Sequence, residues 1–156
     1  MPEKPDFDIN AAHRYFAAEC FNRSWDFIDK HQRSPAEDDE MLHLSLTSLW
    51  HWLQRADATP THLSVGYWQV GRVYALRGEP ANARHYALLS LQASQAAGVE
   101  PFYRGYAYEA LARTEALAGN DEKAGEYLRQ ARSLAEQVED LEDRNLLLKD
   151  LDSIQV

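Results

Sequence analysis

The chain has 156 residues, of which 45% are hydrophobic and 26% are charged, and this length suits one domain with a full core. Its net charge of −9 argues against binding to nucleic acid or to anionic membranes, because both partners require a basic surface. The single cysteine, Cys20, excludes a disulfide framework and a thiolate metal site, and no apolar run is long enough for a signal core or a membrane span. We therefore expect a soluble protein of the cytoplasm.

Seven helices are predicted in chain order, and no stretch alternates apolar and polar residues as a strand does. Most of the 7 glycines and 6 prolines stand at regular intervals, and between them apolar residues recur with helical spacing. Ser34, Pro35 and Glu37 have the spacing of a capping box at the start of the second helix. The predicted helices of this all-α chain cover residues 8–32, 35–57, 60–77, 80–97, 101–118, 121–138 and 140–154.

Helical periodicity also predicts which side chains face inward. These are Tyr15, Phe16, Cys20, Phe21, Trp25 and Ile28 in the first helix, Leu42, Leu46, Leu49 and Leu53 in the second, and Leu141, Leu147, Leu148, Leu151 and Ile154 in the last. The segment LWHWLQR in the second helix places Trp50 and Trp52 on either side of the buried face, with His51 nearest the more open side. If His51 faces solvent, this segment is packing; if it points into a cavity toward the third helix, it belongs to a pocket.

Two stretches of the chain align with a constant offset of 41 residues, one starting at Tyr67 and the other at Tyr108. The equivalent pairs are Tyr67 and Tyr108, Gly71 and Ala112, Arg72 and Arg113, Gly78 and Gly119, Ala83 and Ala124, and Tyr86 and Tyr127. Small residues fall where two helices cross closely, and glycines fall where the chain turns. A repeated helix-turn-helix unit of this kind stacks into a solenoid.

These residues resemble the tetratricopeptide repeat family, although Glu115 stands where the family has tyrosine and the period is 41 instead of about 34 residues. The resemblance covers residues 62–138. It implies a right-handed solenoid of helical hairpins in a single domain, 1–156, made of a divergent pair (8–57), two repeats (60–97 and 101–138) and a capping helix (140–154). The whole chain is also similar to small bacterial helical-repeat proteins, which implies no activity.

In this family the first helix of each pair lines the concave surface, so the resemblance implies a groove that binds a ligand. Its lining would be Trp68, Arg72, Tyr106, Glu109 and Arg113, continued by Val65, Leu76 and Leu117. Tyrosine and tryptophan offer rigid contact area, and arginine offers a fork for a carboxylate. The function implied is non-enzymatic binding of a protein or peptide partner. In the competing interpretation Glu109 pairs with Arg72 or Arg113, and the aromatic residues are packing.

A pocket between the second, third and fifth helices is the alternative, and it would serve a small-molecule sensor or an enzyme. Its residues would be His43, His51, Trp52 and Gln69, gathered around Glu109. His43 and His51 are separated by about 12 Å along one helix, and no two histidines have the i, i+4 spacing of a helical metal site. Single histidines are the simpler interpretation, with His13, His31 and His85 at the surface. We therefore predict no metal, no cofactor and no catalytic residue.

Partners of other kinds are also addressed by the sequence. No basic stripe and no helix-turn-helix reader with basic residues is present, so no nucleic acid partner is predicted. The acidic stretch at 136–152 is predicted to be a solvated helix face. Self-association through an apolar end or edge of the solenoid is a third hypothesis.

Overall fold

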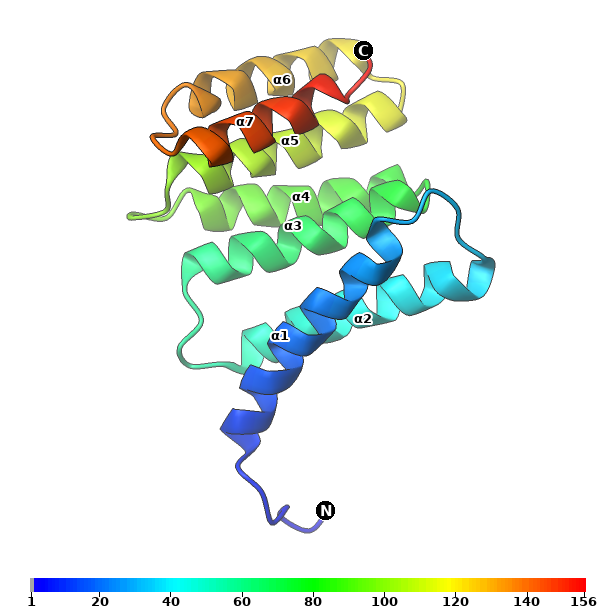
Figure 1. The fold of residues 1–156 in the computed structure, drawn as a ribbon, viewed down its shortest axis with the longest axis vertical. Coiled ribbons are helices and arrows are strands. Elements are labelled where there is room, and N and C mark those ends of the chain that lie inside the picture. Colours follow the sequence, from blue (N-terminus) through cyan, green and yellow to red (C-terminus); the bar gives the residue numbers. More distant parts are fainter. Residues whose placement is uncertain (1) are drawn as a thin grey trace. The chain divides into compact units, whose positions relative to one another are not determined.

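The computed structural model describes residues 2–156, which form two compact units, one ending at Ala58 and the other starting at Thr59. Within this range the chain has seven helices and no strand, which confirms the all-helical prediction (Figure 1). The helices are α1 (Ile9–Ile28), α2 (Pro35–Gln54), α3 (Pro60–Leu76), α4 (Pro80–Ser94), α5 (Pro101–Leu117), α6 (Asp121–Ala135) and α7 (Leu141–Asp152). The single domain predicted from the sequence concerns how the two units associate, and it stays a prediction.

In the first unit, α1 and α2 pack as a helical hairpin whose interface is built from small side chains. The Ser48 hydroxyl donates to the carbonyl of Ala17 at 2.7 Å, so the two helix backbones come very close. Only small residues fit at such a distance, and the large aromatic residues are displaced to the flanks of the interface. Tyr15 and Phe16 are accordingly 59% and 44% exposed, and their predicted inward orientation was wrong.

The turn between α1 and α2 is fixed by local hydrogen bonds. The predicted capping box is present, because the Ser34 hydroxyl accepts the backbone N–H of Glu37 and the Glu37 carboxylate accepts the N–H of Ser34. The Arg33 guanidinium donates to the carbonyls of Phe27 and Lys30 at 3.3 and 2.9 Å. These contacts satisfy carbonyls near the C-terminus of α1, which therefore ends at Ile28 and not near residue 32.

The buried face of α2 differs from the predicted stripe. It consists of Met41, Leu44, Ser45, Ser48 and Leu49. Leu53 is exposed, and Trp50 is 54% exposed and not beside a buried face as predicted. The serines mark the side that approaches another helix, so the apolar stripe read from the leucines alone was rotated away from the true face.

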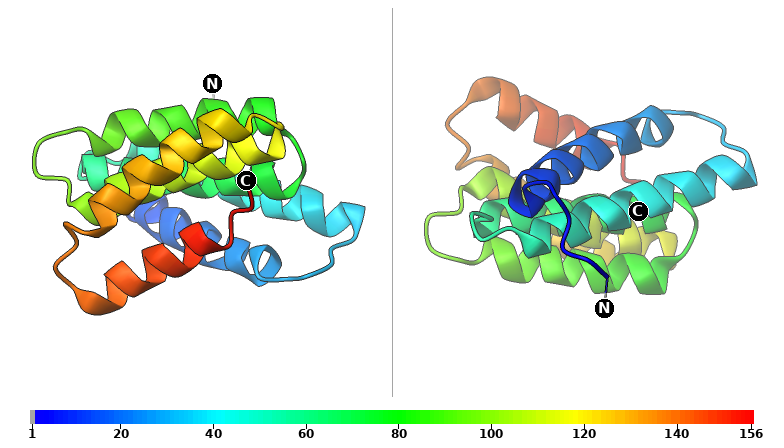
Figure 2. Two further views of the ribbon diagram at one scale, coloured as in Figure 1. Left: turned by 90° about the horizontal axis from the view of Figure 1, so that it is seen from above. Right: turned by 90° about the horizontal axis from the view of Figure 1, so that it is seen from below.

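The second unit contains two hairpins, α3–α4 and α5–α6, in which α4 packs against α5 and α3 also contacts α5. Helix α7 lies across α5 and α6, as the views in Figures 1 and 2 show. Neighbouring helices thus pack pairwise, and α7 contacts α5 and α6 in the way that α5 contacts α3 and α4.

The two hairpins turn in the same way at positions 41 residues apart. Gly78 and Gly119 have φ of 73° and 78°, a left-handed conformation that favours glycine. The next residues, Glu79 and Asn120, donate their backbone N–H to carbonyls five residues earlier, at 3.0 and 2.9 Å. A proline stands in the first turn of four consecutive helices, α2 to α5, where its missing N–H costs nothing.

Equivalent tyrosines also meet inside each hairpin of the second unit. The ring centroids of Tyr67 and Tyr86 are 6.5 Å apart, and those of Tyr108 and Tyr127 are 6.0 Å apart, at nearly the same tilt. A Cβ added to Gly71 would lie 3.4 Å from the backbone of α4, so the predicted close crossing at this small residue is confirmed. The sequence repeat is therefore a repeat of packing within this unit.

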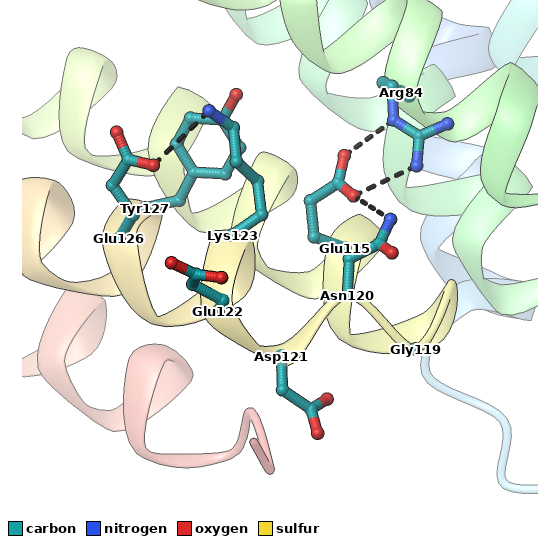
Figure 3. Close-up of a pocket in the computed structure, with 9 residues that line it drawn as sticks. All are labelled: Arg84, Glu115, Gly119, Asn120, Asp121, Glu122, Lys123, Glu126 and Tyr127. Atoms are coloured by element: carbon teal, nitrogen blue, oxygen red, sulfur yellow. Dashed lines mark hydrogen bonds and ion pairs between the residues drawn. The ribbon is translucent and has the colours of Figure 1, made fainter.

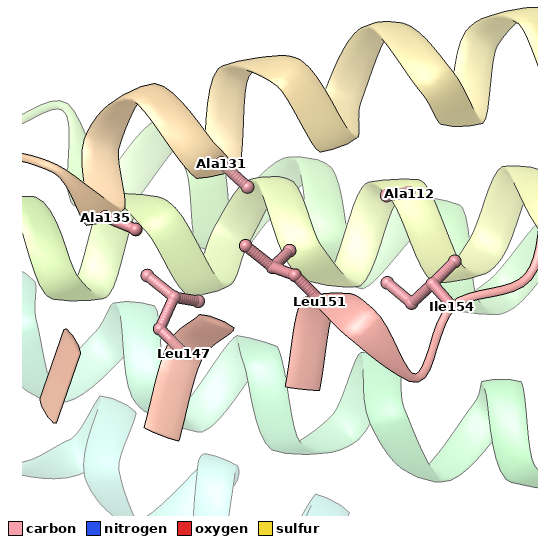
Figure 4. Packing of buried hydrophobic residues seen from close by; sticks show 6 residues of the cluster. All are labelled: Ala112, Ala131, Ala135, Leu147, Leu151 and Ile154. Carbon is pink, nitrogen blue, oxygen red and sulfur yellow. The ribbon is translucent and has the colours of Figure 1, made fainter. Parts of the chain in front are cut away.

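Helix α7 buries one apolar side. Leu147, Leu151 and Ile154 point toward Ala131 and Ala135 of α6 and Ala112 of α5 (Figure 4). Leu141, which was predicted to face inward, is 64% exposed because α7 starts beyond the edge of its receiving surface. Helices α4 and α6 end at Ser94 and Ala135, about three residues before their predicted ends, since the following residues form turns.

Candidate functional site

The predicted groove residues of α3 and α5 come together in the second unit. Trp68 of α3 and Tyr106 of α5 meet edge to face, with 5.5 Å between their ring centroids. Glu109 and Arg113 follow Tyr106 on the same side of α5, and Arg72 follows Trp68 on α3, where it is half-buried. Of the other predicted lining residues, Val65 and Leu76 are half-buried and Leu117 is exposed.

Glu109 is the centre of this group and is 1% exposed. Its Oε2 accepts the indole N–H of Trp68 at 3.1 Å, and its Oε1 accepts the Nε–H of Arg113 at 2.7 Å. A buried carboxylate needs such partners, because an unpaired charge away from water is strongly destabilising. The pairing of Glu109 with Arg113 is thus the one that the competing interpretation of the sequence expects.

Tyr106 and Arg113 also hold the C-terminal helix. The Tyr106 hydroxyl donates to Oδ2 of Asp150 at 2.7 Å. Burial, followed by this hydrogen bond, raises the pKa of Tyr106 well above its usual value, so the hydroxyl remains a donor at physiological pH. Nη2 of Arg113 donates to the Asp150 carbonyl at 3.2 Å and to the Ser153 hydroxyl at 3.0 Å. The two α5 side chains therefore present donors to a separate helix, α7.

Asp150 and Ser153 were not among the predicted site residues. A signal for Asp150 exists, because it lies 41 residues after Glu109, the same separation that joins Trp68 to Glu109. In each case a carboxylate of one helix accepts an aromatic N–H or O–H from the preceding first helix of the repeat. The periodicity thus extends from the two repeats into α7.

A second polar group, which the sequence did not suggest, lies at the α5–α6 turn (Figure 3). Arg84 of α4 binds the carboxylate of Glu115 with two hydrogen bonds of 2.6 and 3.0 Å, and the Asn120 amide adds a third at 2.7 Å. These donors, Arg84 foremost, lower the pKa of Glu115 below its usual value. Glu115 departs from the tetratricopeptide pattern because it joins α5 to the preceding hairpin. It borders an open cleft of about 990 Å³.

The alternative pocket draws its residues from both units. In the first unit His43 is exposed, and Trp52 is half-buried with the guanidinium carbon of Arg55 4.0 Å from its ring centroid. In the second unit Gln69 is buried in α3. His51 and Glu109 each have hydrogen-bond partners inside their own unit. Their convergence around a ligand stays a prediction.

His51 belongs to an aromatic cluster at the unlinked end of the α1–α2 hairpin. Its Nδ1 lies 2.8 Å from Nδ1 of His13, so one imidazole donates and the other accepts. The rings of Phe16 and Trp50 lie 5.4 and 5.0 Å from the His51 ring. Burial, and then the neighbouring His13, lower the pKa of His51. His13 is thus a partner within the unit and not the free surface residue predicted, whereas His31 and His85 are exposed.

Metal and membrane sites were sought over the same residues. Nowhere in 2–156 do three His, Cys, Asp or Glu side chains gather as they would around a metal ion. None of the seven helices in this range has the length and apolar character needed to cross a membrane. Cys20 is buried, which raises the pKa of its thiol.

Comparison of the chain with protein-family models, with curated proteins and with solved structures found no match. The functional argument therefore depends on the geometry of the residues themselves.

Proposed function

We propose that this chain is a non-enzymatic, tetratricopeptide-like helical-repeat module that binds a protein or peptide partner on the surface formed by α3 and α5. One observation carries the proposal: the Tyr106 hydroxyl and the Arg113 guanidinium already receive polar groups from a separate helix, α7. Rigid aromatic rings beside a guanidinium are the composition typical of binding hot spots. A helix laid against such a row is a common mode of peptide recognition.

The repeat geometry supports the finer part of this proposal, a right-handed solenoid with α1–α2 as a divergent third pair. The two hairpins of the second unit share their glycine turns and their tyrosine contacts at a spacing of 41 residues. Repeats that stack in this way expose their first helices side by side, which gives a long surface for an extended or helical ligand.

Buried Glu109 has a supporting role in the proposed site. It holds the Trp68 indole and the Arg113 guanidinium in fixed positions, so both are oriented before a ligand arrives. Changing Arg113 would leave the Glu109 carboxylate buried with one partner fewer and would destabilise the unit. Variants that test binding should therefore leave this ion pair intact.

The test is selection of peptides from a random display library on the immobilised full-length chain. Selected peptides are then titrated against the wild type and against the Arg72→Ala and Tyr106→Phe variants. Arg129→Ala serves as a matched control, because Arg129 is an exposed arginine on α6. We expect the first two changes to weaken binding by about tenfold or more and the control to have no effect. Peptides that bind all four proteins equally would refute the proposed surface.

A further inference from the structure

We propose that α7 is a tethered ligand of the α5 surface, and that the partner is an acidic amphipathic helix that displaces it. This inference rests on the proposed function and names the class of partner and its regulation. The observation behind it is that the side of α5 predicted to meet a ligand is in contact with α7 through apolar, hydrogen-bonded and charged groups together.

The contacts of α7 define what this surface recognises. Leu147, Leu151 and Ile154 have the i, i+4, i+7 spacing of one helical stripe and are buried. Asp150 and Ser153 lie beside that stripe and supply the carboxylate and the hydroxyl that α5 binds. A partner helix would reproduce this pattern, with a carboxylate one residue before its second large apolar residue.

Charge complementarity favours an acidic helix. The receiving side offers Arg113 of α5 and Arg132 of α6, and Arg132 donates to Asp152 of α7 at 2.8 Å. α7 itself carries more acidic than basic residues, and four of its acids stand in the range 141–152. An approaching acidic helix is therefore attracted to the same two guanidinium groups.

Several features allow α7 to leave without unfolding the two hairpins. It is a helix of 12 residues, a length at which an isolated helix is marginal in water, so its structure depends on its docking. It is packed on one side only, and Leu141 and Leu146 on its other sides are exposed. A hollow of about 470 Å³ lies against the segment that joins α6 to α7, between Phe102 and Val138.

The closing experiment uses a fluorescent peptide with the sequence of residues 139–156 and three forms of the full-length chain. The first is the wild type, and the second carries Leu147→Ala and Leu151→Ala, which weaken α7 and leave the receiving surface unchanged. The third adds Tyr106→Phe to the second. Binding is measured by fluorescence polarisation, helix content by circular dichroism, and α7 opening in the wild type by amide hydrogen exchange.

We expect the peptide to bind the weakened chain at least tenfold more tightly than the wild type, because α7 no longer competes. Tyr106→Phe, or Asp150→Asn in the peptide, should each reduce that affinity by about tenfold, as the loss of one charge-assisted hydrogen bond does. Glu142→Gln in the peptide should change nothing, since Glu142 is exposed. In the wild type, α7 amides should exchange faster than those of α5 and α6.

Three results would overturn the inference. The first is a weakened chain that stays helical and binds the peptide no better than the wild type does. The second, which needs no variant, is exchange of the α7 amides only together with those of α3 to α6. The third is dimerisation of the weakened chain in light scattering without peptide, which would make a second copy the occupant. Each leaves the proposed function open to the library selection, whereas a selection without binders would refute that function and not the release of α7.

Discussion

Replacing Glu109 with glutamine tests whether the centre of the site is buried and paired. The substitution keeps the shape of the side chain but removes its charge, and it places an NH₂ group where one carboxylate oxygen accepted a hydrogen bond. Because Glu109 is 1% exposed and accepts from both Trp68 and Arg113, at least one charge-assisted bond is lost and Arg113 loses its counter-charge. Such a bond contributes about 1.5–3 kcal/mol, and breaking a buried ion pair costs about 3–5 kcal/mol. We expect a loss of about 3 kcal/mol in the free energy of unfolding.

The loss is measured by urea denaturation followed by circular dichroism, with a fall in Tm of roughly 10 °C as a second readout. Hydrogen exchange should assign it to the amides of α3 and α5. Glu126→Gln is the matched control, because Glu126 forms only an exposed pair with Lys123 at 3.3 Å and its loss should cost less than about 0.5 kcal/mol. A loss below about 1 kcal/mol for Glu109→Gln would refute the reasoning, since it would mean that the carboxylate is solvated.

Three further predictions concern other parts of the molecule. Gly105→Ala should cost about 1 kcal/mol net and selectively speed hydrogen exchange in α7, because the added Cβ would lie 2.6 Å from Cδ2 of Leu147 while helix propensity improves. Glu115→Gln should cost about 2 kcal/mol at pH 7 in urea denaturation and nothing at pH 2, because the lowered pKa of Glu115 stabilises the fold only while the carboxylate is ionised. The α1–α2 hairpin should be fully stable above about pH 6.5 and lose stability as the pH falls, because folding lowers the pKa of His51; proton NMR titration of the wild type and of His13→Gln measures the change, and an unshifted His51 would contradict it.

The helices and their turns could be predicted because their determinants are local. The capping box at Ser34 and the left-handed glycines at 78 and 119 depend on residues within a few positions of each other, and each was found where the sequence placed it. The constant offset of 41 residues likewise identified the tyrosine contacts, because equal spacing along equal hairpins brings equivalent residues to equivalent places.

The orientation of the α1 aromatics could not be predicted, because it depends on a distance between two helices. Periodicity alone favours burying Phe16, and only the approach of Ser48 to the Ala17 carbonyl shows that no room exists for it. The same holds for His13, whose partner His51 lies 38 residues away. Asp150 was missed for another reason: the repeat pattern ends before α7, and one acidic residue in an acidic helix carries no visible signal.

The polar series along the first helices explains why recognition is centred on α5. Arg72, Arg113 and Ile154 occupy equivalent positions, each 41 residues after the one before, as do Glu109 and Asp150. In α5 the arginine is present, so Arg113 both balances Glu109 and donates to the next helix. In α7 the equivalent residue is the buried Ile154, which cannot donate to anything beyond it. α7 can therefore receive hydrogen bonds from α5 but cannot pass them on, so the surface that binds a polar helix ends at α5.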